Sequence, residues 1–378
     1  MKNNSFARNW LRKMHLWIGL ITALFVLILS VTGAMLIYAK DIQTIINPQY
    51  WTVAEQSSRL PISTLLENVE ATSGQTVTVV STEPEYRDRA WQLRLDNGEY
   101  VSVDPYTGEI LLTYAFEEHL YGFTMSVHRW LLYRDTDNRT SLRNWVSVVA
   151  LLFIFEVLFG FYLWVKPKKR LKRLKINTRA KTKILLYQLH TVLGVFLFLP
   201  LLLIAFSGIA FNWKAPTAAV VSALSPGQIE ARPPVAEFTP GQQLAINRAI
   251  ENGLRALPQA TLFRIYMPAS PGEALKLRVQ MPGETHAYSW IWMNPFTAQV
   301  LQTFDASAAS AATQVWNFKY KFHIGGFAGP IVEALWLIMA LSPCFFVISG
   351  IYFWQHRRKS KPVPKFRAPK NAIDNHSL

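Results

Sequence analysis

The chain has 378 residues, of which 51% are hydrophobic and 13% aromatic, and its formal net charge is +15. This composition is typical of a membrane protein that also carries sizeable polar domains. The only cysteine, Cys344, excludes a disulfide framework and an iron–sulfur cluster held by several thiolates.

Four apolar stretches follow one another along the chain, at 14–39, 142–165, 184–213 and 329–354. Each is long enough to cross about 30 Å of hydrocarbon as a helix, which takes roughly 20 residues. Basic residues precede the first stretch, as in a signal peptide, but its apolar run is longer than a signal sequence needs, so we expect it to be retained. The sequence therefore predicts four transmembrane helices.

Lysine and arginine concentrate beside these stretches, with 4 up to Lys13, 10 in the loop 166–183 and 7 from Arg357 onward. Because loops rich in these residues stay in the cytoplasm, we place both termini and the loop 166–183 on that side. Membrane topology thus explains the positive charge, and we expect no nucleic-acid binding.

Two regions, 41–141 and 214–328, must then lie on the periplasmic side, and each is large enough for a small domain. The first predicts a helix at 62–71, strands at 77–81, 89–95 and 99–104, and a hairpin at Asn97-Gly98. The second repeats this order, with a helix at 242–256 and strands at 262–267, 275–280 and 286–293. A turn and a further short strand follow from Asp104 and from Asn294. We therefore expect two α+β domains.

The two halves of the chain correspond to each other. Asp104 and Asn294 lie 190 residues apart, as do Gly160 and Gly350. The same offset at two positions, together with the same order of predicted elements, indicates two parallel repeats related by a pseudo-twofold axis along the membrane normal. The predicted parts are helix 1 with its cytoplasmic N-terminus (1–40), domain 1 with an interfacial helix (41–141), helix 2 (142–165), the basic loop (166–183), helix 3 (184–213), domain 2 with an interfacial segment (214–328), helix 4 (329–354) and the basic cytoplasmic tail (355–378).

An aromatic segment separates each domain from the following span, at 114–133 and at 315–327. Apolar residues in the first of them recur at roughly helical spacing, which predicts an amphipathic helix in the membrane interface. His128 and His323 lie on these segments, and hence near the outer membrane edge.

Two more histidines, His15 and His190, lie near the cytoplasmic edge, each followed by glycines at the same spacings of 4 and 18 residues. Duplicated imidazoles on facing helices are typical of haem b, which needs a neutral imidazole on each side of the porphyrin. Symmetry pairs His15 with His190 and His128 with His323, so we predict two haem b groups. Small neighbours would let the macrocycle approach the backbone, and the candidate pocket residues are Gly19, Gly194, Gly33, Gly208 and Arg129.

Other interpretations remain open at this point. A single histidine in a membrane helix is often only a packing residue, and Gly33 and Gly208 would serve helix packing equally well. Zinc or copper is disfavoured because no thiolates or carboxylates accompany the histidines at metal-binding spacing. The roles of Glu156, the one acid inside a span, and of His119 are left undecided.

Several motifs resemble the PepSY-associated transmembrane family of bacterial inner-membrane proteins over nearly the whole chain. Asn294 and Ala298 stand where the PepSY signature has Asp and Gly, which argues against a ligand function for the second turn but not against its fold. The motifs are the Gly-x-Tyr-x-Trp endings of two spans, Asp104-Pro-Tyr-Thr-Gly-Glu109, Met14-His15-Leu-Trp-Ile-Gly19, Val127-His128-Arg-Trp-Leu131, Leu189-His190-Thr-Val-Leu-Gly194 and Phe322-His323-Ile-Gly-Gly326.

The resemblance implies two periplasmic PepSY-like domains and an activity similar to that of ferrioxamine-type siderophore reductases. Such a di-haem b protein would pass electrons outward to a ferric siderophore, of the hydroxamate type, and release Fe(II). No G-x-G-x-x-G motif opens a helix, so the sequence shows no NADH or flavin site of its own, and the donor would be quinol, a reduced flavin or a partner protein. The alternatives are a haem-free regulator or binding module, since PepSY domains are also linked to peptidase inhibition, and a siderophore or iron transporter.

Overall fold

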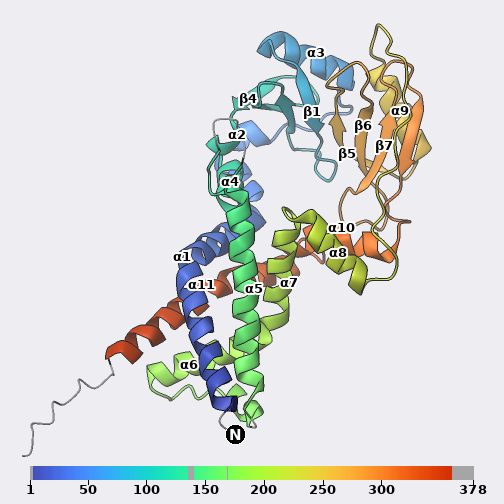
Figure 1. Ribbon diagram of the computed structural model, residues 1–378. Coiled ribbons are helices and arrows are strands. Elements are labelled where there is room, and N and C mark those ends of the chain that lie inside the picture. Colours follow the sequence, from blue (N-terminus) through green and yellow to red (C-terminus); the bar gives the residue numbers. More distant parts are fainter. Residues whose placement is uncertain (1–2, 135–139, 168, 360–378) are drawn as a thin grey trace, which may run out of the picture.

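The computed structural model describes residues 3–134, 140–167 and 169–359. Long helices form one part of the molecule, and a β-sheet carrying two helices forms the other (Figure 1). Residues 360–378, most of the predicted cytoplasmic tail, lie outside the described residues.

The helical part contains the candidate membrane spans. Within the described residues, α1 (Asn3–Ile46), α5 (Arg143–Val165) and α11 (Pro330–Lys359) are each long and apolar enough to cross a membrane. A bent pair, α6 (Thr182–Phe196) and α7 (Phe198–Ala210), meets the same criteria only when taken together. The spans therefore number three, or four if the pair is one span.

The third apolar stretch is not the one uninterrupted helix that the sequence suggested. α6 and α7 meet at Leu197 with a bend of 62°. Pro200 explains the break, because it has no amide hydrogen for the carbonyl of Phe196 and its ring would clash with that carbonyl in a continuous helix. In α7 the proline lies in the first turn, where no intrahelical donor is needed.

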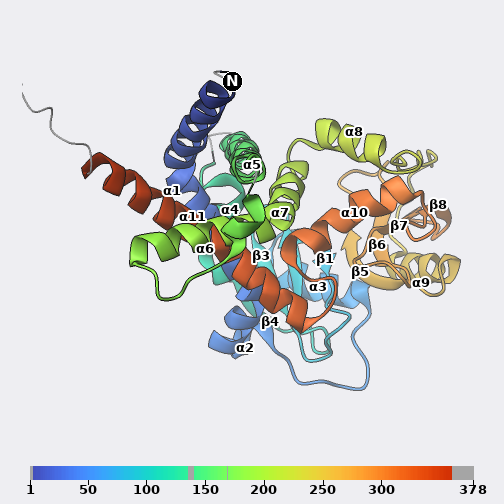
Figure 2. The same ribbon diagram turned by 90° about the horizontal axis from the view of Figure 1, so that it is seen from below.

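Each half pairs a span with an interfacial helix. α1 packs against α4 (Leu120–Trp130), and also against α5 and α11 (Figures 1 and 2). In the second half, α7 packs against α10 (Ala311–Ile324), which also contacts α8 (Lys214–Leu224). The helix expected in the first aromatic segment is thus α4, and the second segment, for which no helix was predicted, lies largely in α10.

The sheet contains eight antiparallel strands in the order β4-β3-β2-β1-β5-β6-β7-β8. Each half contributes four consecutive strands that pair with their neighbours in the chain, and the hairpin predicted at Asn97-Gly98 joins β2 to β3. The strands are β1 (Val77–Ser81), β2 (Trp91–Leu95), β3 (Tyr100–Val103), β4 (Ile110–Tyr114), β5 (Thr261–Tyr266), β6 (Leu275–Gln280), β7 (Ser289–Met293) and β8 (Val300–Phe304).

The two α+β domains, expected as separate units, share this sheet. They join through β1 and β5, where Val80 lies opposite Ile265. Pairing the first strand of each half removes two exposed sheet edges, which would otherwise present unpaired amides and carbonyls.

One face of the sheet is covered by α3 (Ile62–Ser73) and α9 (Ile246–Ala256), and the hydrophobic core lies beneath them (Figure 1). β6 alternates as a half-buried strand should, with Leu275 and Leu277 fully buried and Lys276 on the opposite face. The smaller elements are α2 (Pro48–Trp51) and the 3-10 turns η1 (Phe116–Glu118) and η2 (Arg170–Leu174).

Replacing Ile265 with alanine is expected to weaken the junction between the halves. Ile265 is fully buried on β5, so its truncation should cost about 2–5 kcal/mol of unfolding free energy. Hydrogen exchange of the β1 and β5 amides would measure the loss of protection. Thr261→Ala, at an exposed position of the same strand, is the control, and equal protection in both variants would contradict the junction.

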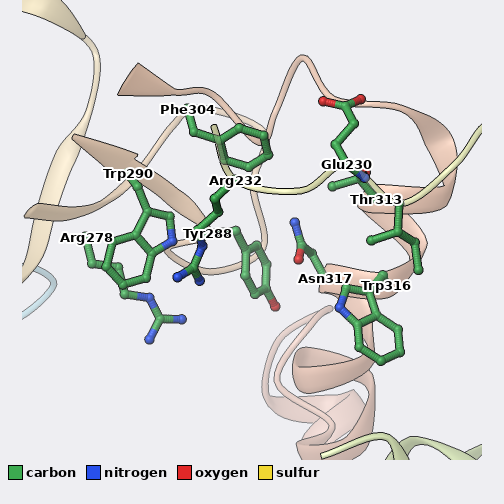
Figure 3. A pocket seen from close by; sticks show the side chains of 10 residues that line it. Glu230, Arg232, Arg278, Tyr288, Trp290, Phe304, Thr313, Trp316 and Asn317 are labelled. Carbon is green, nitrogen blue, oxygen red and sulfur yellow. The ribbon is translucent and has the colours of Figure 1, made fainter. Parts of the chain in front are cut away.

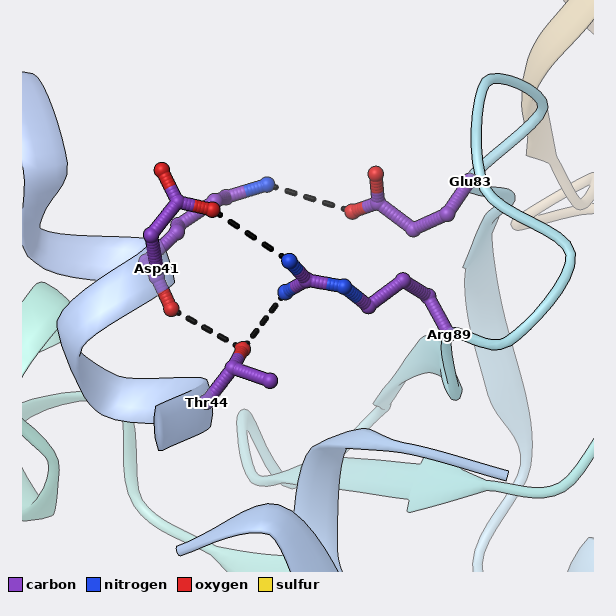
Figure 4. A network of polar contacts seen from close by, with 5 residues as sticks. Asp41, Thr44, Glu83 and Arg89 are labelled. Atoms are coloured by element: carbon purple, nitrogen blue, oxygen red, sulfur yellow. Dashed lines mark hydrogen bonds and ion pairs between the residues drawn. The ribbon is translucent and has the colours of Figure 1, made fainter. Parts of the chain in front are cut away.

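Polar contacts tie the C-terminal part of α1 to the loop between β1 and β2 (Figure 4). Lys40 donates to the Glu83 carboxylate over 3.2 Å, and Arg89 donates to Asp41 over 3.3 Å and to the Thr44 hydroxyl over 2.5 Å. Exposed ion pairs contribute only about 0–1 kcal/mol each. Their effect here is therefore mainly to orient the sheet relative to α1.

Candidate functional site

The structure brings His128 and His323 together at the end of the helical part that adjoins the sheet. Their ring centroids lie 6.2 Å apart. His128 Nδ1 lies 3.0 Å from the Thr32 hydroxyl of α1, and His323 Nδ1 lies 3.0 Å from the Ser207 hydroxyl of α7. Because α1 and α7 belong to corresponding spans, the same contact is built twice.

His15 of α1 and His190 of α6 form the second pair, with centroids 6.5 Å apart. The symmetry is less strict here. His15 Nδ1 lies 3.0 Å from the Glu156 carboxylate and 3.1 Å from the Glu156 carbonyl, whereas His190 Nδ1 lies 2.6 Å from the Ser349 hydroxyl. Glu156 thus contacts a predicted ligand, although its role was undecided from the sequence.

Both separations suit one iron atom between two imidazoles. A metal–imidazole bond is about 2 Å long and the ring centre lies about 1.2 Å further back, so two imidazoles on opposite sides of one iron place their centroids about 6.4 Å apart. Within the described residues, no group of three or more His, Cys, Asp or Glu is placed to hold a metal ion. The four histidines are therefore arranged as pairs.

The hydrogen bonds also suit ligand chemistry. An imidazole whose Nδ1–H donates to the protein keeps an unprotonated Nε2, which is the form that binds a metal ion. The carbonyls of Glu156 and Ile204 are placed to accept from His15 and His323, at 3.1 and 3.2 Å. Burial lowers the pKa of His128 and of His323, and at His128 the second imidazole adds to this effect. Both rings on α4 and α10 are therefore neutral near pH 7.

Two of the four predicted pocket glycines contact the histidines directly. A Cβ added at Gly33 would lie 3.1 Å from His128 Cε1, and one at Gly208 would lie 3.2 Å from His323 Cε1. These are close contacts, so a larger residue at either position would displace the ring. Gly33 of α1 and Gly208 of α7 thus belong to the pair His128–His323.

The other two glycines are placed differently from the prediction. A Cβ at Gly19 would lie 2.8 Å from the Glu156 carboxylate, and one at Gly194 only 3.8 Å from Phe346. The glycine against His15 is instead Gly160 of α5, at 3.1 Å. The reason is that helical side chains point toward the N-terminus, so each histidine lies over the turn before it and not over the glycine that follows.

Arg129 lies near the pair His128–His323, since its positive charge contributes to the lowered pKa of both imidazoles, whereas His119 packs outside the pairs. The Arg129 guanidinium lies 5.8 Å from the centroid of the Trp130 ring on the same helix. The His119 ring packs edge-on against Trp51 and Tyr114, at 5.4 and 5.1 Å. His119 is therefore a packing residue of the first half of the sheet.

Hydroxyl groups that we did not predict from the sequence contact three of the histidines. Thr32, Ser207 and Ser349 each directly precede a glycine, namely Gly33, Gly208 and Gly350. A hydroxyl–glycine dipeptide in three of the four spans is a signal that the sequence contained. The remaining span, α5, has Phe159 before Gly160, and there Glu156 contacts His15 instead.

A family model described as PepSY-associated TM region matches residues 12–357. The chain belongs to this family. The matched region contains the four paired histidines and the whole sheet. The histidine pairs are therefore part of the PepSY-associated TM region itself. No curated protein matches the chain significantly.

Both turns of this PepSY-associated TM protein have the same conformation, although the second departs from the signature. Asp104 Oδ1 accepts from the Tyr106 amide over 2.7 Å, and Asn294 Oδ1 accepts from the Phe296 amide over 2.9 Å. Ala298 adopts a φ of 58° at the position where Gly108 has 77°. The substitutions therefore preserve the fold of the turn, as the sequence indicated.

Proposed function

We propose that this membrane protein holds two haem b groups between its histidine pairs and passes electrons outward to a ferric siderophore. The observation that carries the proposal is the pairing of imidazoles at 6.2 and 6.5 Å. On α1, His15 and Gly33 mark the two pairs, and the 18 residues between them span about 27 Å of helix. This length is close to the thickness of the hydrocarbon core, so the pairs suit sites near its two faces.

In this proposal, His15 and His190 hold the inner haem, and His128 and His323 hold the outer one. When bound, haem supplies one-electron oxidation and reduction at its iron. The Nδ1 contacts fix the orientation of the rings, and Gly33, Gly208 and Gly160 let them lie close to neighbouring helices.

The substrate step needs only one electron. Fe(III) in the siderophore becomes Fe(II), a softer ion that hard oxygen ligands hold less tightly, and Fe(II) is then released. The donor is quinol or a cytoplasmic partner. The positive-inside rule puts the basic loop 166–183 in the cytoplasm and the sheet in the periplasm, in a bacterial inner membrane.

A transporter is less well supported. Inverted or parallel repeats that carry substrates break their helices at corresponding positions in both halves. Here α6 and α7 are broken at Leu197, but α1, the corresponding span, runs unbroken from Asn3 to Ile46. The break is therefore a feature of one half only.

The visible spectrum of the purified protein, with haem counted per chain, tests the proposal. We expect two haems per chain and low-spin α and β bands that sharpen on dithionite reduction. A haem-free regulator would show no Soret band, and that result would end the proposal. Reduction of a ferric siderophore, followed with an Fe(II) trap in lipid nanodiscs, would then test the substrate step.

A further inference from the structure

A pocket of about 150 Å³ lies in the second half of the sheet, on the face opposite α9. It is enclosed by β6, β7 and β8, by the N-terminal part of α10, and by the linker that follows α8 (Figure 3). Hydrogen bonds fix the linker to α10, since the Glu230 amide donates to the Thr313 hydroxyl over 2.8 Å and the Ala312 amide donates to the Pro226 carbonyl over 3.1 Å.

The pocket is positively charged. Arg232 lies over the Trp290 ring at 4.1 Å and Arg278 lies 6.0 Å from the same ring, with both guanidinium groups beside Trp290 (Figure 3). Partial burial and the charge of Arg278 lower the pKa of Arg232, so the two like charges act on each other. Among the described residues, neither guanidinium takes part in an ion pair with a carboxylate.

The one acid of the pocket is already engaged. Glu230 accepts from the Ser310 amide over 2.6 Å, at the first turn of α10. Burial raises the pKa of Tyr288 to about 12, so its hydroxyl stays protonated and can donate to an anion. With two arginines and one glutamate among its lining residues, the pocket keeps a net positive charge.

An aromatic surface continues from this pocket. Trp290 stacks with Tyr266 at 5.5 Å and with Trp292 at 6.1 Å. These rings line an open hollow of about 660 Å³ together with Lys276 and both arginines. That volume lies in the range of sites for small organic ligands, roughly 300–1,000 Å³.

The first half lacks this surface. Strand register places Gln92 opposite Ser102, where the second half has Lys276 opposite Trp292. Ser102 donates to the Tyr50 carbonyl over 2.6 Å, and Tyr100, the counterpart of Trp290, packs against Tyr114. The equivalent face of the first half is therefore filled by its own residues, and the charged aromatic pocket is a specialisation of the second half.

The pocket also lies close to the outer histidine pair. Trp316 and Asn317 line it, and His323 follows on the same helix. The seven residues from Trp316 to His323 make two turns, about 10 Å. A ligand in the pocket would thus lie near the proposed outer haem.

We propose that the open hollow, together with the pocket that adjoins it, binds the iron chelate, and that this surface selects an anionic chelate with aromatic ligand groups, of the catecholate kind. This inference rests on the proposed function. A ferric tris-catecholate is trianionic and presents flat rings, which match guanidinium groups and tryptophan faces. A ferric tris-hydroxamate has no net charge, so the pocket favours a substrate class different from the one that the family resemblance implied.

Calorimetric titration of the full-length protein in zwitterionic nanodiscs tests the inference. The probes are gallium(III) tris-catecholate, gallium(III) tris-hydroxamate and gallium(III) citrate, because gallium(III) reports binding without being reduced. We expect the catecholate to bind at least about tenfold more tightly than the other two. Equal affinity for the hydroxamate or the citrate, or no binding of the catecholate, would overturn the inference.

Variants locate the site. Arg232→Gln and Arg278→Gln should each weaken catecholate binding by about tenfold without changing haem content. Arg94→Gln, at the position of β2 that corresponds to Arg278, should leave it unchanged, and an equal loss there would refute the site. If the purified protein binds gallium(III) tris-catecholate as expected but contains no haem, that result would count against the proposed function and not against the binding site.

Discussion

The His128→Ala variant is expected to bind one haem per chain instead of two. His128 and His323 face each other at 6.2 Å, and no other histidine is paired with either ring in the described residues. Removing one axial ligand should release the outer haem, because a single imidazole leaves one side of the iron without a ligand. His323→Ala should have the same effect, while the inner pair, on α1 and α6, keeps its haem.

His119→Ala provides the matched control for this experiment. His119 lies just before α4 and packs against Trp51 and Tyr114, so its loss should leave both haems in place. Haem quantified by the pyridine haemochrome method, together with circular dichroism to confirm folding, gives the result. Two haems per chain in folded His128→Ala and His323→Ala proteins would refute the ligand assignment.

Much of the fold followed from local patterns. The strands at 77–81 and 275–280 coincide with β1 and β6, and the helix expected at 62–71 is α3, because alternation, hairpin glycines and helical periodicity are encoded within a few residues. The pairing of Val80 with Ile265 has no such signal. It depends on which of several sheet edges meet, and no stretch of neighbouring residues records that choice.

The histidine pairs were predictable because the repeat supplied the missing long-range information. Two copies of one motif, related by a twofold axis, bring their equivalent residues face to face, as His15 and His190 are. The bend at Leu197 was harder to predict, since Pro200 is compatible either with a kink inside one helix or with the first turn of a new one. Packing around the proline decides between these.

The contacts around each ring were the least predictable feature. Gly160 and Gly350 each begin a Gly-x-Tyr-x-Trp motif and lie 190 residues apart. A Cβ at Gly160 would lie 3.1 Å from His15 Cε1, yet a Cβ at Gly350 would meet nothing within 4 Å. The difference arises from how α5 and α11 lie against their neighbours, which the repeat does not determine.

Gly160→Val and Gly350→Val should therefore differ strongly. At Gly160 the valine methyl groups would occupy the space of the His15 ring, and moving that ring away from His190 should release the inner haem and cost about 1–3 kcal/mol of stability. Gly350→Val should retain both haems, because the new side chain enters open space. Both variants place a β-branched residue at the equivalent point of an apolar span. The effect of valine on helix propensity is therefore the same in both variants and cancels in the comparison.

Haem content and the reduction potential of the remaining haem would measure the difference. In Gly160→Val we expect one haem whose potential matches that of the outer site, as defined by the His15→Ala variant. The same result in Gly350→Val would mean that valine disturbs the spans generally. Two unperturbed haems in Gly160→Val would mean that the His15 ring does not depend on Gly160, and the inner pair would need another support. His15 also contacts Glu156, which lies on the same helix as Gly160. A third variant, Glu156→Gln, therefore separates the effect of steric fit at Gly160 from that of the contact between His15 and the Glu156 carboxylate.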